Sequence, residues 1–378
     1  MNEVGMIQFL IERKADPNGP VHREMPVPRA LAFASEERFT HHPGERALHI
    51  AVVRGNVEVV RMLKRAGADP NATDKRGRTP LLTACGCLEG CVEIVRLLLE
   101  AGANPALAEK ENGYAPLHLA AQNGHTEFID MLCKAAPSVL STYATAGETP
   151  LFMACATGHE MIASRLLSLG AMQVVPPDKR GMLPLAVAVK GGHMGVVRVM
   201  IDRGIGIRAI GGRVMFPNAL YSSVRHHQAR ILCVLLGAHG EERRTEWANT
   251  DLSDQKLLHC GAGFCSPGAV SVLLRSGADE AALDSQGRVP RDTIGADPRM
   301  KVKNYRKKEI AIRRMLQRGP AYRARSWAWR TEEAKDGGGC GDQGVVLSSA
   351  QAPKTPAVGV RIFRPKNDRK FFARAVGR

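Results

Sequence analysis

The chain has 378 residues, with 53 Lys and Arg against 37 Asp and Glu, which gives a formal net charge of +16. A hydrophobic content of 44% is enough to bury a core and excludes a fully disordered chain. No run approaches about 18 consecutive apolar residues, so we expect no membrane span. Residues 1–14 also lack the layout of a signal peptide.

The positive charge is concentrated at the C-terminal end. Residues 299–378 hold 21 Lys and Arg against 6 Asp and Glu, a net charge of +15, whereas the preceding residues hold 32 against 31. We therefore predict a nearly neutral body followed by a basic segment. Any electrostatic argument about partners belongs to that segment.

A unit of about 33 residues recurs through most of the chain. It reads Gly, one residue, a block such as Thr-Pro-Leu-His, an Ala, a Gly, paired aliphatic residues and then Gly-Ala-Asp or Gly-Ala-Asn. The blocks begin at residues 46, 79, 115, 149, 183, 216, 256 and 289. This regular spacing predicts a stack of similar units rather than two or three globular domains.

Each unit carries the signals of two helices joined by a turn. Thr79 and Thr149 can cap a helix, and the Pro after each of them suits the first helical position. A glycine such as Gly124 turns the chain, and apolar residues at helical spacing, such as Ile94 and Leu98, predict the second helix. The Gly-Ala-Asp ending supplies a left-handed helix cap and a turn.

Two regions depart from the pattern. Residues 1–20 hold only the second half of a unit, so we expect a truncated chain or an improvised cap there, followed by an insert at 21–44. In the unit at 216–255, Tyr221-Ser222-Ser223 replace the small residues, and we expect a polar loop over 239–255. We predict that this unit forms the weakest interface in the stack.

The stretch at 112–125, Asn-Gly-Tyr-Ala-Pro-Leu-His-Leu-Ala-Ala-Gln-Asn-Gly-His, closely resembles the consensus of the ankyrin-repeat family. The ending Gly-Ala-Asp-Pro-Asn-Ala at 67–72 is similar to its repeat ending, and the resemblance covers roughly residues 4–318. It implies an all-α solenoid of about eight helix–loop–helix units plus an N-terminal half unit. We accordingly expect a half repeat at 1–20, an insert at 21–44, the solenoid with a C-terminal capping helix at 45–320, and a basic, largely disordered tail at 321–378.

Histidines often suggest catalysis, but the repeat explains most of them here. Three occupy one position of the four-residue block, where the resemblance implies a ring that hydrogen-bonds the backbone between units: His49, His118 and His259. Three others follow the turn glycine: His125, His159 and His193. Because periodic placement accounts for all six, we expect them to be structural.

Cys85, Cys87 and Cys91 form the densest group of cysteines. A structural zinc site takes four ligands, whereas this group offers three thiols and no adjacent histidine. Cys85 and Cys155 share one small, buried repeat position, so we attribute them to packing. The total of nine cysteines is odd and no secretion signal precedes them, so we expect no disulfide framework and an intracellular location.

Enzyme motifs are missing from the sequence. It contains neither a G-x-x-x-x-G-K-[ST] phosphate loop nor an H-E-x-x-H motif, and no pair of carboxylates stands out from the solvated turns. We therefore expect no catalytic residues, no bound metal and no cofactor, and a function that is not enzymatic.

Binding residues follow from the resemblance, which implies that loop tips and the outer faces of first helices contact partner proteins. Carried over position by position, they are Lys75, Arg76, Arg78, Glu111, Asn112, Tyr114, Gln122, Asn123, Glu148, Lys179, Arg180, Met182 and Lys190. The alternative is that each is a solvated residue without a partner. Tyr114 and the arginines are the strongest candidates, because Tyr and Arg are enriched among binding hot spots.

Residues 305–318 predict a basic amphipathic helix. Such a helix could bind a membrane surface, a calmodulin-like protein or nucleic acid, or it could close the solenoid as a polar cap. We favour the cap, because Met315 and Leu316 stand where the aliphatic pair of a final second helix belongs.

The tail at 321–378 mixes basic residues with Trp327, Trp329 and three phenylalanines around low-complexity stretches. It could contact phosphates and stack on bases, or act as a nuclear import signal. The alternatives are a solvated segment and a misread coding region.

The leading hypothesis is a scaffold or adaptor that binds one or more proteins through the loop tips and the concave face of the solenoid. The alternative is a nucleic-acid-associated or nuclear protein that uses the basic tail, while the solenoid recruits a protein partner. In either case we expect a monomer in the cytoplasm, the nucleus or both.

Overall fold

The computed structural model describes residues 16–19, 45–87, 91–171, 183–204, 216–238, 240–252, 255–295 and 305–318. All of them belong to the first of two compact units, 1–340 and 341–378, into which the contacts divide the chain. The predicted insert at 21–44 and the predicted tail at 321–378 lie outside the described residues.

Helices pair within each repeat unit. The first helices are α2 (Ala47–Val53), α4 (Pro80–Gly86), α6 (Pro116–Asn123), α8 (Pro150–Thr157), α10 (Pro184–Gly191), α12 (Phe216–Arg225) and α15 (Leu257–Gly263). The second helices are α3 (Val57–Arg65), α5 (Val92–Glu100), α7 (Thr126–Ala135), α9 (Glu160–Ser168), α11 (Met194–Asp202), α13 (Ala229–Gly237) and α16 (Pro267–Arg275).

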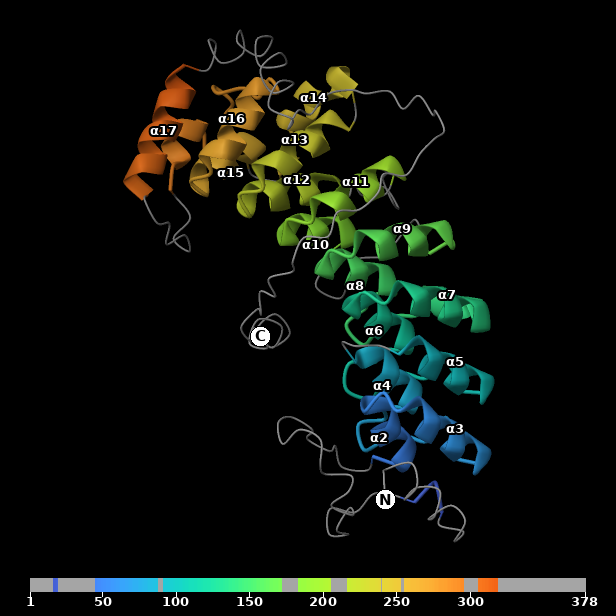
Figure 1. The fold of residues 1–378 in the computed structure, drawn as a ribbon. Helices are drawn as coiled ribbons and strands as arrows, with labels where there is room; N and C mark the ends of the chain where they lie inside the picture. Colours follow the sequence, from blue (N-terminus) through green and yellow to red (C-terminus); the bar gives the residue numbers. More distant parts are fainter. Residues whose placement is uncertain are drawn as a thin grey trace, which may run out of the picture. The chain divides into compact units, whose positions relative to one another are not determined.

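The units stack in chain order. Each first helix contacts the next first helix, from α2 to α15, and each second helix contacts the next second helix, from α3 to α16. Figure 1 shows the two rows side by side, with the second helices of the lower units on the right. The expected all-α repeat solenoid is therefore confirmed.

Local chemistry starts and ends these helices as the sequence predicts. The Oγ1 atoms of Thr79 and Thr149 accept hydrogen bonds from backbone N–H groups three residues on, at 3.2 and 3.1 Å. The glycines that end α6, α8 and α10 have φ values of +89°, +83° and +76°. Only glycine adopts this left-handed conformation without steric cost, so the turn to the second helix depends on it.

Histidine rings tie neighbouring units together, as predicted. The Nε2 atoms of His49, His118 and His259 lie 2.9, 3.1 and 2.9 Å from carbonyl oxygens of the following loops. The three histidines after the turn glycines bond to the preceding unit instead. Their Nε2 atoms hydrogen-bond with backbone carbonyls at the end of the preceding first helix: His125 with Cys87 O, His159 with Gln122 O, and His193 with Ala156 O.

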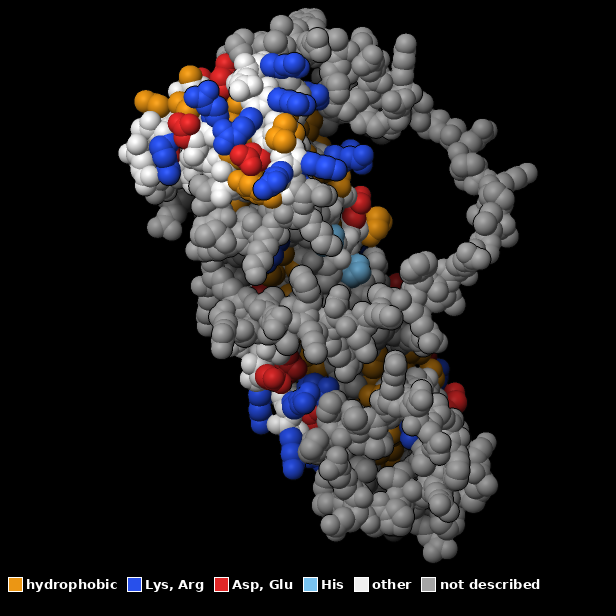
Figure 2. All heavy atoms as spheres, turned by 90° about the vertical axis from the view of Figure 1, so that its left-hand side faces the viewer, with side chains coloured by type: hydrophobic (Ala, Val, Ile, Leu, Met, Phe, Trp, Pro, Cys, Tyr) orange, Lys and Arg blue, Asp and Glu red, His pale blue; other side chains and the backbone are white. Residues whose placement is uncertain are grey.

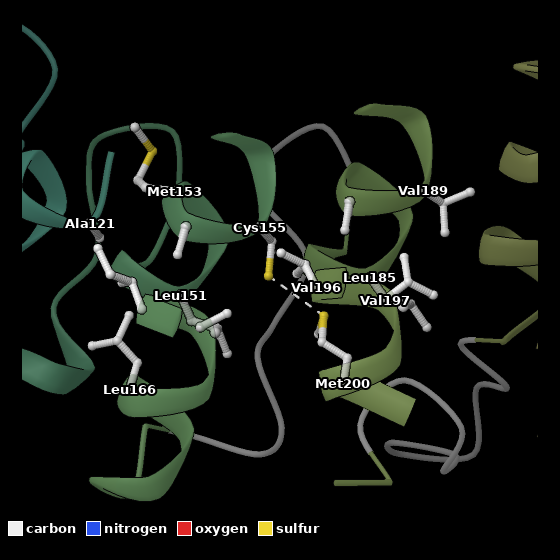
Figure 3. Packing of buried hydrophobic residues seen from close by; sticks show 14 of the residues in the cluster. Ala121, Leu151, Met153, Cys155, Leu166, Leu185, Val189, Val196, Val197 and Met200 are labelled. Atoms are coloured by element: carbon white, nitrogen blue, oxygen red, sulfur yellow. Dashed lines mark hydrogen bonds between the residues drawn. The ribbon is translucent and has the colours of Figure 1, made fainter. Parts of the chain in front are cut away.

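Aliphatic and sulfur-containing side chains fill the space between units. Figure 3 shows Leu151 and Leu166 on one side of such a contact and Val196 on the other. Across it, the fully buried Cys155 thiol lies 3.5 Å from the sulfur of Met200. The predicted packing role of Cys155 is therefore confirmed.

The expected polar loop at 239–255 is wrong. Residues 240–248 form helix α14 (Gly240–Ala248), and a small antiparallel hairpin of β1 (Asp251–Leu252) and β2 (Gln255–Lys256) follows. Glu, Arg and Ala are good helix formers, and their propensity outweighs the polarity that suggested a loop. After the helix, the side chain of Asn249 donates to Gly277 O and accepts the N–H of Asp279. Asn71 makes the same two bonds in an earlier unit, to Gly102 O and to the N–H of Asn104.

Shortened elements stand at both ends of the described stack. Near the N-terminus, Asn18 bonds to Gly67 O and Asp69 N, which repeats the pattern of the complete units. At the other end, the short helix η3 (Pro290–Thr293) replaces a first helix, and α17 (Tyr305–Gln317) packs on α16 and η3. A further short helix, η2 (Pro137–Ser141), follows α7.

Candidate partner-binding surface

Three successive loops project beside the first helices and form a row that we call the loop row: residues 74–78, 109–114 and 144–148. Backbone hydrogen bonds close each loop, for example from Glu109 N to Tyr114 O at 3.1 Å. Two further backbone bonds join neighbouring loops, from Lys110 N to Arg76 O at 3.0 Å and from Thr145 N to Asn112 O at 2.8 Å. The loop tips are therefore held at fixed spacing by the backbone itself.

The first loop is built around a buried carboxylate. Oδ1 of Asp74 accepts the backbone N–H groups of Arg76 and Arg78 at 2.9 and 2.8 Å, and Oδ2 accepts Nε–H of Arg78 at 2.9 Å. The side chain of Asp74 is fully buried, and Glu45 lies 3.9 Å from the same guanidinium. Arg78 is thus a structural cation of the loop.

The candidate binding residues fall into three groups. Four are exposed: Lys75, Arg76, Glu111 and Lys190. Six are partly buried: Arg78, Asn112, Tyr114, Gln122, Asn123 and Glu148. Three lie outside the described residues: Lys179, Arg180 and Met182.

Several of the partly buried residues have structural contacts of their own. Asn123 donates to Cys85 O at 3.0 Å, and Asn112 donates to a carboxylate oxygen of Glu109 at 3.1 Å. The ring of Tyr114 lies 5.9 Å from that of His118 and packs on the core. In the described part of the chain, Oε2 of Glu148 is buried without a hydrogen-bond partner.

Sequence reasoning missed an exposed lysine of the loop row. Lys110 is exposed, and its side chain passes Gly77, where an added Cβ would come within 2.7 Å of Lys110 Cγ. Gly77 has a φ of +76°, so a glycine is required there on both counts. The two residues lie one repeat period apart, which places them in neighbouring loops, but the spacing alone does not place the side chain of Lys110 on Gly77.

Two histidines that the sequence did not single out, His226 and His227, directly follow α12. Burial lowers the pKa of His226, and the nearby charges of Lys190, Arg225 and His227 lower it further. Burial likewise lowers the pKa of His227, with a smaller contribution from Lys308. Both imidazoles are thereby held in the neutral form more strongly than free histidine.

Burial disfavours the reactive thiolate form at three of the described cysteines. Burial raises the pKa of Cys85, Cys87 and Cys155, so their thiols stay protonated. Among the described residues, no group of three or more His, Cys, Asp and Glu side chains could hold a metal ion. None of the described helices is long and apolar enough to cross a membrane.

These features define a helical repeat solenoid that presents a rigid row of loops. A family model described as ankyrin repeats (3 copies) matches residues 1–109, 48–142 and 117–210, which together make up more than half of the chain. The chain therefore belongs to the ankyrin-repeat family, whose repeats generally serve as non-catalytic protein-interaction modules.

Several curated proteins are similar to part of the chain. NF-kappa-B inhibitor alpha of Sus scrofa is 32% identical over 112 residues, 29% of this chain and 35% of that protein. E3 ubiquitin-protein ligase XBAT32 of Arabidopsis thaliana is 32% identical over 164 residues, 43% of this chain and 30% of that protein. Tyrosine-protein kinase HTK16 of Hydra vulgaris is 35% identical over 89 residues, 24% of this chain and 12% of that protein. In each of these three cases the match spans about a third or less of the relative's length.

Proposed function

We propose that the chain is a non-enzymatic scaffold or adaptor that binds a protein partner through the loop row and the adjoining first helices. The observation that carries the proposal is the pair of backbone hydrogen bonds between loops, at Arg76–Lys110 and Asn112–Thr145. A surface ordered before binding loses less conformational entropy when the partner arrives. The similar proteins are named as an inhibitor, a ligase and a kinase, which supports a binding module that occurs in proteins of different activity.

Within this surface, the exposed charges are the side chains we assign to the partner. Lys75 and Arg76 project from the first loop, and Lys110 and Glu111 from the second. Tyr114 adds a partly buried ring between them and the first helices. We keep Lys179, Arg180 and Met182 in the proposal because they occupy the corresponding positions of a later unit in the sequence.

The test is an affinity pull-down that compares the proteins bound by the wild-type chain with those bound by the K75E/R76E variant. Both side chains are exposed, so the variant is expected to fold normally and to lose the partner. The control R198E reverses an exposed arginine on α11, away from the loop row, and should retain the partner. Leu97→Ala removes a buried side chain and should lower the free energy of unfolding by about 2–5 kcal/mol. This variant shows how much binding is lost when only the fold is weakened.

A second candidate function follows from the charge distribution. Residues 299–378 carry a net charge of +15, which favours contact with nucleic acid. The test is a salt titration of binding to random DNA and RNA, with the full chain and with a chain that ends before residue 321. A steep salt dependence that disappears on truncation supports a nucleic-acid-associated protein, which we would place in the nucleus. Otherwise we place a monomeric adaptor in the cytoplasm, the nucleus or both.

A further inference from the structure

Helix α17 presents two different faces. Ile312, Met315 and Leu316 are buried, and the helix packs with them on α16 and η3. This contact buries the apolar stripe of the amphipathic helix. The opposite face therefore has to be explained separately.

That opposite face has an exposed isoleucine at its centre. Ile310 is 49% exposed, although it stands in a helix that is otherwise polar on this side. Its neighbours three and four residues away on the helix surface are all basic and exposed: Arg306, Lys307, Arg313 and Arg314. We call these five residues the α17 face. Figure 2 views the molecule from the side on which α17 lies in Figure 1, and in its upper part Lys and Arg side chains gather with hydrophobic side chains among them.

The charges of the α17 face are largely uncompensated. Arg313 pairs with Glu309 at 3.0 Å. Among the described residues, no ion pair is formed by Arg306, Lys307 or Arg314. Lys308 on the flank adds another positive charge. An apolar side chain among four cations, of which only Arg313 has an acidic partner in the described part of the chain, is the arrangement that an acidic protein segment complements.

We infer that the α17 face is a second docking surface, which binds an acidic protein segment with an apolar side chain placed on Ile310. The four cations lie within about 6 Å of Ile310 along the helix axis, because a helix rises 1.5 Å per residue. A partner helix with one apolar residue and Asp or Glu three and four residues to either side matches this spacing. The surface does not depend on the loop row, so an adaptor could hold two proteins.

Other occupants fit the face less well. Insertion into a membrane would need the apolar stripe that is buried against α16. A phosphate backbone would satisfy the cations but would leave Ile310 without an apolar partner. The chain's own residues 319–378 hold 12 Lys and Arg against 5 Asp and Glu, so they carry the same sign of charge as the face.

The experiment uses the full chain and two peptide libraries. In the first, 14-residue peptides carry a central leucine with Glu three and four residues to either side and random residues elsewhere. In the second, Gln replaces each of these Glu residues. Selective enrichment of the Glu library is expected, and equal recovery of both libraries would overturn the inference.

Variants of the α17 face then test the contributions of its apolar residue and of its positive charges separately. I310S is expected to weaken binding of a selected peptide about tenfold, the size expected for one buried aliphatic side chain. R306E/R314E should abolish binding and its salt dependence. The controls M161S and R198E change an exposed methionine and an exposed arginine elsewhere and should bind as wild type.

The remaining outcomes are equally decisive. Unchanged peptide binding by I310S would overturn the inference, because Ile310 would then contribute nothing. Binding of random RNA or of vesicles of phosphatidylcholine and phosphatidylserine without enrichment of the Glu library would also overturn it, in favour of a phosphate-binding face. Thermal unfolding of each variant, with a midpoint near that of the wild type, establishes that lost binding is not lost folding.

Discussion

The ring of His118 joins two repeat units through both of its nitrogen atoms. Nε2–H donates to the backbone carbonyl of Glu148 at 3.1 Å, and Nδ1 accepts the backbone N–H of Ala115 at 3.2 Å. We assign this tautomer from the two partners, since a carbonyl only accepts and an amide N–H only donates. An imidazolium has no acceptor atom, so protonation breaks the bond from Ala115 N–H to Nδ1, whereas Nε2–H still donates to Glu148 O.

Acidification is therefore expected to destabilise the solenoid. Burial of the ring lowers the pKa of His118 to about 4, whereas an unfolded histidine titrates at about 6.5. Between these values the unfolded chain binds more protons, so this residue's contribution is present above about pH 6.5 and is lost as the pH falls toward about 4. The loss reaches about 3 kcal/mol. Urea unfolding at several pH values across this window measures it.

The control for this prediction removes the titrating ring. His118→Gln lowers the free energy of unfolding at neutral pH, but it should also flatten the pH dependence between about pH 6.5 and 4. Burial lowers the pKa of His49 as well, so part of the dependence should persist. Identical slopes for wild type and variant would rule out His118 as the source.

Two neighbouring arginines of the first loop should behave differently. Arg78→Ala leaves the fully buried carboxylate of Asp74 without its cation, and we expect it to lower the free energy of unfolding by about 2 kcal/mol. Arg76→Ala removes an exposed side chain and should change it by no more than about 0.5 kcal/mol. Urea unfolding of both variants tests this, and equal effects would contradict the assignment of Arg78 as structural. Only Arg76 is then suited to a test of partner binding.

Local signals made much of this fold predictable. Thr79 caps α4 and Gly124 ends α6 as the sequence indicates, because caps and turns depend on residues a few positions apart. The structural role of Arg78 and the exposed position of Arg76 could not be told apart from the sequence, because both residues follow the same turn aspartate. Contact with the distant Glu45 is part of what sets them apart. Helix α14 was missed because its charged residues suit an exposed loop and an exposed helix equally.

His227 occupies a position where four of the other described units use glycine and the α15–α16 unit uses Cys265. Its φ is +58°, and the equivalent Gly192 has a φ of +76°. Side chains with a Cβ pay a steric cost in this region, so His227→Gly should raise the free energy of unfolding by about 0.5–1 kcal/mol. Gly192→Ala should lower it, since an added Cβ would also lie 2.9 Å from the side chain of Gln228. Chemical denaturation measures both, and destabilisation by His227→Gly would show that the imidazole contributes more than its backbone costs.

The unit that contains His227 is expected to open more easily than the rest of the stack. Its first helix α12 contacts α10 through the buried Ser222, whose hydroxyl lies 3.3 Å from Ala186 O. Other units place larger apolar side chains at this position, such as Leu119, Met153 and Val187. The positive charges of Lys190 and Arg225 both lie close enough to His226 to lower its pKa. Because repeat stability is close to a sum of unit and neighbour terms, a strained unit with a polar interface should unfold locally. Amide hydrogen exchange should be faster in α12 than in α6, and His227→Gly should slow it, whereas equal protection of the two helices would show the prediction to be wrong.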